Sequence, residues 1–291
     1  MTERLDRRAA VITGASQGLG LEIARAFVRA GASVVLCARD AVALQQATEA
    51  VRALAGPDQT VLALASDVSR QQDVTRLVTT ALDRLPHLDI LVNNAGVYGP
   101  MGPVEEAAWD EWVQAVSVNL LGSVLMCRAL LPHLKGRRHG KIVQLAGGGA
   151  TRPMPNFSAY AASKVAVLRF AETLAGEVKE YGIDVNAVAP GLLNTRLLDQ
   201  LLEAGPERAG REMYDRSIRQ REEGGASLQR AAELVVFLAS AGSDGITGRL
   251  ISAVWDPWET LAERRQTLEQ TDIYTLRRIV PKDRGLDWGE R

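Results

Sequence analysis

The stretch VITGASQGLGLEIARAF, residues 11–27, decides the fold. It places Gly14, Gly18 and Gly20 between an apolar β-branched run and a segment with helical apolar spacing. A glycine-rich turn between a strand and a helix lets the backbone approach a pyrophosphate, whose negative charge the helix N-terminus stabilises. The spacing is TGxxxGxG rather than GxGxxG, and three glycines alone also occur in ordinary tight turns. In its strand–helix context the segment predicts a dinucleotide-binding turn, with further contacts from Ser16, Gln17 and Leu19.

Outward from this turn, short β-branched runs alternate with longer segments of helical apolar spacing. The runs that predict strands are 9–13, 33–38, 61–68, 89–96, 141–146, 183–190 and 249–254. The segments that predict helices are 19–30, one that begins near 40, 74–85, 111–133, 160–181 and 227–240. Such alternation implies a parallel sheet covered on both faces, and near-continuously apolar strands fit burial on both sides. We therefore expect an α/β fold, a doubly wound Rossmann-type parallel sheet, in one domain over residues 1–254.

Two regions interrupt this alternation. Residues 192–226 are polar and glycine-rich, and a long insertion in a compact domain is commonly a substrate loop or lid. Residues 255–291 hold three of the five tryptophans. A disordered end is one interpretation of this extension, but its aromatic residues favour packing on the pocket or on a subunit interface. The aromatic residues expected to anchor it are Trp255, Trp258, Tyr274 and Trp288.

Composition narrows the class of function. The 291 residues include 34 basic and 35 acidic ones, for a formal net charge of −1. This balance gives no electrostatic footprint for nucleic acid or an anionic membrane, so a small-molecule partner is favoured. We see no apolar segment of signal-peptide or membrane-spanning length and expect a soluble, cytoplasmic protein. Cys37 and Cys127 lie in apolar contexts and are expected to be buried, reduced packing residues.

The ends of the predicted strands suggest further cofactor contacts. The second strand ends Ala38-Arg39, where a small residue followed by a positive charge leaves room for a 2′-phosphate. This favours NADP(H) over NAD(H), although Asp40 follows directly and a solvated arginine is the alternative. Asp67 and Val68 end the third strand, where a carboxylate can accept from the adenine amino group. Small residues and amides after the fourth strand allow close approach to the cofactor, at Asn94, Ala95 and Gly96.

Together these residues resemble the short-chain dehydrogenase/reductase family of NAD(P)-dependent oxidoreductases over about residues 7–254. The motifs occur in the family's order: TGASQGLG (13–20), Asp67, NNAG (93–96), Asn119, YAASK (160–164), and Pro190-Gly191 followed by Thr195. The resemblance implies a carbonyl–alcohol interconversion by hydride transfer. It also implies a homotetramer or homodimer, with the helices near 111–133 and 160–181 at an interface.

The resemblance further assigns roles. Tyr160 would be the general acid that protonates the substrate oxygen, and Lys164 would lower the pKa of that tyrosine and hold the nicotinamide ribose. Asn119 would hold a water that links the lysine to solvent, and Thr195 would contact the nicotinamide carboxamide. Elementary chemistry agrees, because a free tyrosine titrates near 10 and needs a nearby cation to exchange protons at neutral pH. One helical turn puts Tyr160 and Lys164 on the same face.

One position departs from the family pattern. The family places a serine thirteen residues before the tyrosine, where it hydrogen-bonds the substrate carbonyl, and here that position is Gly147. The nearest hydroxyls are Thr151 and Ser158. Losing one oxyanion donor typically costs about 10²–10³ in turnover. A backbone N–H of the glycine run or Thr151 could supply the donor; the serine could be lost in a slow enzyme; or the chain could be a non-catalytic cofactor-binding protein.

The end of the family's sheet is altered as well. The usual Gly-Gly is replaced by Ala253-Val254-Trp255-Asp256, which should redirect the chain and remodel the pocket or a subunit contact. The identity of the substrate does not follow from the sequence. Arg152 or Arg196 could meet an anionic group, with solvated arginines as the alternative.

Overall fold

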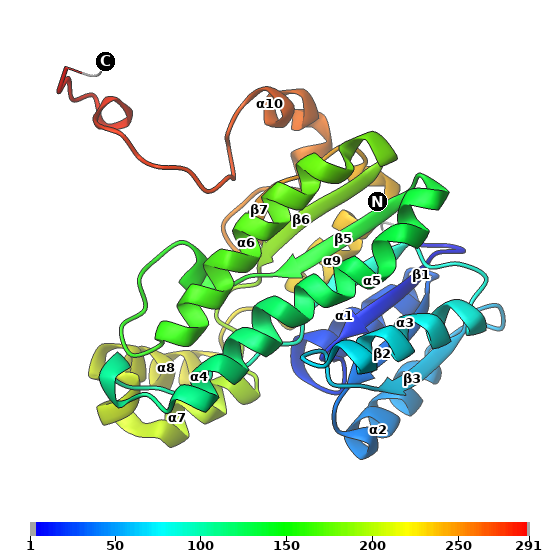
Figure 1. Ribbon diagram of the computed structural model, residues 1–291, viewed down its shortest axis with the longest axis horizontal. Helices are drawn as coiled ribbons and strands as arrows, with labels where there is room; N and C mark the ends of the chain where they lie inside the picture. Colours follow the sequence, from blue (N-terminus) through cyan, green and yellow to red (C-terminus); the bar gives the residue numbers. More distant parts are fainter. Residues whose placement is uncertain (1–3, 290–291) are drawn as a thin grey trace.

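The fold is built on one parallel sheet of seven strands in the order β3-β2-β1-β4-β5-β6-β7, seen in a computed structural model that describes residues 4–289 (Figure 1). The strands are β1 (Ala9–Thr13), β2 (Ser33–Ala38), β3 (Val61–Ala65), β4 (Ile90–Asn93), β5 (Gly140–Leu145), β6 (Ile183–Ala189) and β7 (Leu250–Ser252). The order reverses between β1 and β4, which are neighbours in the sheet. The predicted doubly wound α/β fold is confirmed. Residues 1–3 of the expected domain and 290–291 of the expected extension lie outside the described residues.

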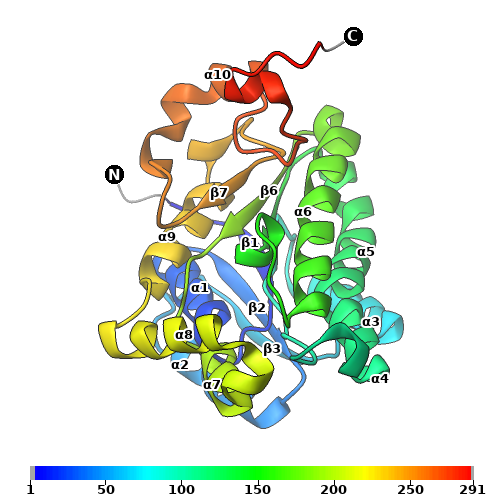
Figure 2. The ribbon, with the colours of Figure 1, turned by 90° about the vertical axis from the view of Figure 1, so that its left-hand side faces the viewer.

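Helices cover both faces of the sheet because its strands are apolar on both sides. One face is covered by α1 (Gly18–Arg29), α2 (Ala41–Arg52) and α9 (Leu228–Ala239), whose apolar residues share one buried cluster with the strands. The other face is covered by α3 (Gln71–Arg84), α5 (Gly122–Arg137) and α6 (Ser158–Val178), in a second cluster. Figure 2 shows the sheet between these two layers. Cys37 and Cys127 are both buried and free, as expected.

The helix that runs into α5 is longer than the sequence pattern predicts. It begins with α4 (Trp109–Val116), passes through a π-helical turn, η2 (Ser117–Leu121), and continues as α5. Over its 29 residues it is long and apolar enough to cross a membrane, which corrects the expectation that no segment has this length. Core helices of soluble proteins meet the same criteria, and the buried side of α5 belongs to the cluster shared with α3 and α6.

Residues 192–226 are mostly helical rather than an irregular loop. They form α7 (Arg196–Ala209) and α8 (Arg211–Glu223), which pack against each other beyond the carboxyl ends of the strands (Figure 2). Gly205, with φ +78°, breaks the helical path of α7 directly before Pro206. The polar, glycine-rich composition concealed these helices, because each buries only a few residues: Leu198, Leu201, Ala209 and Ser217.

The C-terminal extension packs onto the sheet edge through some of its aromatic residues. It contains a 3-10 segment, η6 (Trp258–Arg264), and α10 (Arg265–Gln270). Trp258 is buried against Phe237 of α9, and the Leu250 N–H donates to the Tyr274 carbonyl at 2.8 Å, which extends pairing beyond β7. Trp255 and Trp288, also expected as anchors, are 84% and 76% exposed in the single chain, so packing of these two on a subunit interface stays a prediction.

Candidate active site

A cavity of about 1220 Å³ lies at the carboxyl ends of the strands. Turns that follow β1 to β6 line it, together with α7, α8 and the beginning of the C-terminal extension. Ligands of open α/β sheets bind at this edge, where the strand order reverses. The sequence-predicted residues that line the cavity are Gly14, Ser16, Gln17, Gly18, Leu19, Arg39, Asp67, Val68, Asn94, Ala95, Gly96, Gly147, Thr151, Tyr160, Lys164, Pro190, Gly191 and Thr195.

The glycine-rich turn has the backbone geometry that a phosphate cradle requires. Gly14 and Gly18 have φ of +65° and +55°, which side-chain-bearing residues rarely adopt. A Cβ at Gly14 would lie 2.8 Å from Ala95 Cα. Gly18 opens α1, whose N-terminus has no side-chain cap. Gly20 does not line the cavity: a Cβ there would collide with the Gly14 carbonyl oxygen, so this glycine allows helix–turn packing. The turn therefore fits a dinucleotide pyrophosphate.

Arg39 and Asp40 both border the cavity after β2, but among the described residues only one of the two side chains is free to contact a ligand. The Asp40 carboxylate caps α2, because its Oδ1 accepts from the N–H groups of Val42 and Ala43, both at 3.0 Å. Arg39 is exposed at the cavity edge. Asp67 is partly engaged as well, since its Oδ1 accepts from the Ser69 hydroxyl at 2.7 Å. The positive charge is thus freer to meet a ligand than the neighbouring negative one.

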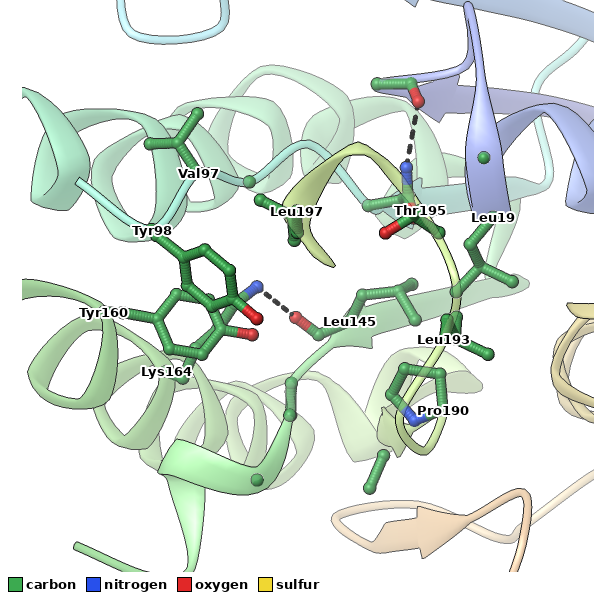
Figure 3. A pocket seen from close by; sticks show the side chains of 18 of the residues that line it. Leu19, Val97, Tyr98, Leu145, Tyr160, Lys164, Pro190, Leu193, Thr195 and Leu197 are labelled. Carbon is green, nitrogen blue, oxygen red and sulfur yellow. Dashed lines mark hydrogen bonds between the residues drawn. The ribbon is translucent and has the colours of Figure 1, made fainter. Parts of the chain in front are cut away.

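The two residues expected to move the proton meet at the inner end of the cavity. Tyr160 and Lys164 lie one turn apart on α6, and Lys164 Nζ is 5.7 Å from the centre of the Tyr160 ring. Nζ donates to the Leu145 carbonyl at 2.7 Å, where β5 ends (Figure 3). Tyr160 is 9% exposed and Lys164 5%.

Burial sets the protonation of this pair. Burial raises the pKa of Tyr160, and the adjacent Tyr98 raises it further. This direction is opposite to the lowering that the sequence led us to expect, because desolvation penalises a phenolate. Burial also lowers the pKa of Lys164, to about 8. At neutral pH Tyr160 is therefore a neutral phenol, and Lys164 is mostly a cation beside it.

Asn119 connects three elements around this pair. It lies in the π-helical turn, where its Oδ1 accepts from the Val97 N–H at 2.8 Å and its Nδ2 donates to the Val97 carbonyl at 2.9 Å. The same Nδ2 donates to Ser163 Oγ on α6, also at 2.9 Å. A Cβ on Gly96 would lie 3.4 Å from both Asn119 Oδ1 and Lys164 Nζ, so both atoms face that glycine. The amide thus fixes the loop after β4 against α6.

Position 147, just after β5, has no room for a side chain. Gly147 has φ +155° and ψ 178°, a region that is nearly specific to glycine. A Cβ there would lie 2.7 Å from the Tyr160 hydroxyl oxygen. The two hydroxyls considered from the sequence do not both face the cavity. Thr151 lines it, whereas Ser158 does not, because its Oγ accepts from Trp112 Nε1 at 3.1 Å. Ser158 is therefore withdrawn as a substrate contact.

The wall after β6 is largely apolar. Pro190, Gly191 and Thr195 line it, and Thr195 directly precedes α7 and faces Gly18 across the cavity, its Cγ2 3.4 Å from a Cβ built on that glycine. The apolar side chains that line this wall are Leu192, Leu193, Leu197, Leu198, Leu201 and Met213. Three exposed arginines also border the cavity, at Arg152, Arg196 and Arg216.

Sequence reasoning missed several lining residues. Tyr98 packs edge-on against Tyr160, with ring centres 4.8 Å apart. Its place two residues after the Asn-Ala-Gly motif was the available signal. Asp256 and Tyr274 of the extension also line the cavity, and the Asp256 carboxylate accepts from the Ser252 N–H at 2.7 Å and from the Tyr274 side chain. Nothing in the sequence pattern joined those two residues.

The fold and this cavity define a Rossmann-type protein with a glycine-rich turn at one end of the cavity and a buried Tyr–Lys pair at the other. The family model described as short chain dehydrogenase matches residues 8–205. The L-fucose dehydrogenase of Oryctolagus cuniculus is 34% identical over 204 residues, which cover 69% of this chain and 68% of that protein. The chain belongs to the short-chain dehydrogenase/reductase family, and its relatives are oxidoreductases.

Two solved structures resemble the whole fold. Levodione reductase has 28% sequence identity and a TM-score of 0.79, with 89% of this chain and 100% of that chain covered. A gluconate 5-dehydrogenase from Burkholderia cenocepacia J2315, solved with NADP and tartrate, has 29% identity and a TM-score of 0.75. The likeness covers 86% of this chain and 94% of that chain. These relatives act on small molecules, as their names state.

Proposed function

We propose that this chain is an NADP(H)-dependent oxidoreductase that interconverts a carbonyl and an alcohol of a small molecule, with Tyr160 as the acid/base. The observation that carries the proposal is one continuous cavity with the glycine-rich turn at one end and the buried Tyr160–Lys164 pair at the other. A bound reduced nicotinamide would supply a hydride to the carbonyl carbon. The chain's own residues would then transfer a proton to the substrate oxygen and stabilise the negative charge that develops on it.

In the reductive direction, Tyr160 transfers its hydroxyl proton to the substrate oxygen, so that C=O becomes CH–OH. The cationic Lys164 stabilises the phenolate that remains until solvent returns the proton. We also propose that a water near Asn119 carries that proton, because the Asn119 Oδ1 and Lys164 Nζ face the same glycine. Tyr160 is buried as a neutral phenol, which suits a proton donor.

The preference for NADP(H) rests on Arg39. Its neighbour Asp40 is committed to capping α2, which supports a site that attracts a 2′-phosphate rather than one that binds a free ribose diol. Titration of the apo protein with NADPH and NADH, followed by nicotinamide fluorescence, tests this assignment. We expect tighter binding of NADPH and a reversed preference in Arg39→Asp. Equal or tighter binding of NADH by the parent protein would overturn it.

The substrate itself is proposed to carry a negative group. Arg152, Arg196 and Arg216 border the cavity without an ion pair among the described residues, whereas Asp256 is held by Tyr274 and the Ser252 amide. A sugar-acid type of substrate would also parallel the gluconate 5-dehydrogenase named above. We expect Arg216→Met to raise KM for carboxylate-bearing carbonyls more than for neutral ones. A uniform change across both classes would contradict this assignment.

The alternative is a cofactor-binding protein without turnover, which Gly147 favours. A panel of ketones, aldehydes and sugar-derived carbonyls separates the two functions. An oxidoreductase oxidises NADPH with at least one member of the panel, whereas a binding protein binds NADPH and oxidises it with none.

A further inference from the structure

The end of β5 cannot itself supply a side-chain donor to the substrate oxygen. Gly147 has a backbone conformation that disfavours any side chain, and its Cβ position lies 2.7 Å from the Tyr160 hydroxyl oxygen. Its neighbour Ala146 also lacks a hydroxyl. A second hydrogen bond from a side chain to the substrate oxygen would therefore have to come from a different element of the cavity wall.

Tyr98, in the loop after β4, is the hydroxyl-bearing side chain in ring contact with Tyr160. The two ring centres are 4.8 Å apart at an interplanar angle of 67°. Figure 3 shows both rings turned toward the same part of the cavity, near the end of β5. Among the described residues, no hydrogen-bond partner occupies either hydroxyl. Two unpartnered phenol groups thus face one space, and burial keeps the pKa of Tyr98 near 12, so that its proton is retained.

The position of Tyr98 is held from two sides. The Asn119 side chain forms hydrogen bonds with both the N–H and the carbonyl of the preceding residue, Val97. Phe157 packs edge-on against the Tyr98 ring, with centres 5.2 Å apart. A donor fixed before the reaction stabilises developing charge without having to reorganise. These contacts do not depend on the Tyr98 hydroxyl, so a phenylalanine at this position would keep them.

We propose that Tyr98 is a further catalytic residue, whose hydroxyl donates the second hydrogen bond to the substrate oxygen in place of the absent serine. The inference rests on the proposed oxidoreductase function. A carbonyl oxygen has two lone pairs, and Tyr160 and Tyr98 approach it from α6 and from the loop after β4. As negative charge develops on that oxygen, Tyr160 gives up its proton, while Tyr98 keeps its own and only donates a hydrogen bond.

The test compares Tyr98→Phe with the parent protein and with Tyr214→Phe, using a carbonyl that the parent reduces. Tyr214 packs, like Tyr98, against the small hydrophobic cluster that contains Phe157 and Tyr160, but it does not line the cavity, so its variant is the matched control. We expect Tyr98→Phe to lower kcat by about 10²–10³-fold, with a smaller change in KM and an unchanged dissociation constant for NADPH. Tyr214→Phe should keep kcat within about twofold of the parent value.

A second variant separates loss of the hydroxyl from loss of structure. Ala146 lines the cavity beside Gly147. The double variant Tyr98→Phe/Ala146→Ser should therefore have a kcat at least about tenfold higher than that of Tyr98→Phe alone. A Tyr98→Phe protein with kcat within about threefold of the parent overturns the proposal and leaves the donor to the Thr151 hydroxyl or to backbone N–H groups of residues 147–149. A parent that oxidises NADPH with no carbonyl overturns this proposal together with the oxidoreductase function, and that outcome is visible before any variant is made.

Discussion

The acid/base pair illustrates how burial acts on single residues. Tyr160 and Lys164 share one buried wall, and desolvation moves their pKa values in opposite directions, up for the phenol and down for the ammonium. The pair therefore holds its protons at neutral pH, as the proposed role of Tyr160 as a proton donor requires. Because burial lowers the pKa of Lys164 to about 8, Lys164 rather than Tyr160 changes its charge close to neutral pH.

The rate of carbonyl reduction should consequently fall at alkaline pH. Below about pH 8 Lys164 is charged and stabilises the phenolate that forms on Tyr160; above that pH the charge is lost. We expect kcat/KM for reduction to be level below the pKa and to fall by up to about tenfold per pH unit above it, since kcat/KM reports groups of the free enzyme. Steady-state rates in a constant-ionic-strength buffer series measure this. A level profile to about pH 9.5 would contradict it.

Gly147 should not tolerate the serine that is usual in the family. The φ of +155° and the close Tyr160 hydroxyl mean that Gly147→Ser strains the backbone by about 1–3 kcal/mol and displaces the Tyr160 side chain. We expect a lower thermal midpoint and lower turnover. Ala146→Ser, one residue earlier, serves as the control and should leave the thermal midpoint nearly unchanged. A Gly147→Ser protein that is both stable and faster would show that the end of β5 is differently shaped.

Among the elements, the C-terminal extension is held in part by one arginine of the sheet edge, which makes several of its contacts. The Arg249 guanidinium, at the start of the last strand, donates to the carbonyls of Leu268, Thr271 and Ile273. Beyond these contacts the chain crosses to α6, where the Leu276 N–H donates to Glu172 at 2.6 Å. The extension thereby brings Asp256 and Tyr274 to the cavity wall.

Arg249→Met should loosen this attachment. Because hydrogen bonds to a charged group contribute about 1.5–3 kcal/mol each but are not additive, we expect a loss of about 2–4 kcal/mol in the free energy of unfolding. The extension should also become sensitive to proteolysis, and KM for the substrate should rise. Urea denaturation and limited proteolysis measure these effects. Arg278→Met, at an exposed arginine of the same extension, is the control, and an equal loss there would contradict the account.

The strands were predictable, while the elements that shape the substrate end were not. Runs such as SVVLCA at 33–38 are apolar on both faces, so their burial follows from composition alone. By contrast, α8 carries mostly polar residues and buries only Ser217, while α7 has leucines at helical spacing but is interrupted at Gly205. In the extension, Trp258 packs against Phe237, whereas Trp255, whose N–H donates to Ser252 Oγ, is exposed.

The same division holds within the candidate site. The glycine turn and the Tyr160–Lys164 pair follow from local spacing, since each lies within one turn or one helix. The contact between Tyr98 and Tyr160 joins residues 62 positions apart, and no local pattern encodes it. The clash that reserves position 147 for glycine is likewise a contact with α6 rather than a property of β5.

At the scale of the whole molecule, we expect self-association. In the most apolar 18-residue stretch of the composite helix over 109–137, only 44% of the stretch is buried. The helix exposes Trp109, Val113 and Leu121. These residues lie where the family resemblance implies an interface with a second copy of the chain. Light scattering after size-exclusion chromatography should give the mass of a dimer or tetramer, and Leu121→Asp should lower it. A monomer at micromolar concentration would contradict this expectation.

The central claim is that one chain joins a dinucleotide cradle to a tyrosine proton donor, and Tyr160→Phe tests it most directly. The measurement is NADPH oxidation with a carbonyl that the parent reduces, made beside a fluorescence titration of NADPH binding. We expect turnover to fall by at least about 10²-fold, while the NADPH dissociation constant changes little. A Tyr160→Phe protein that still reduces the carbonyl at the parental rate would contradict the account.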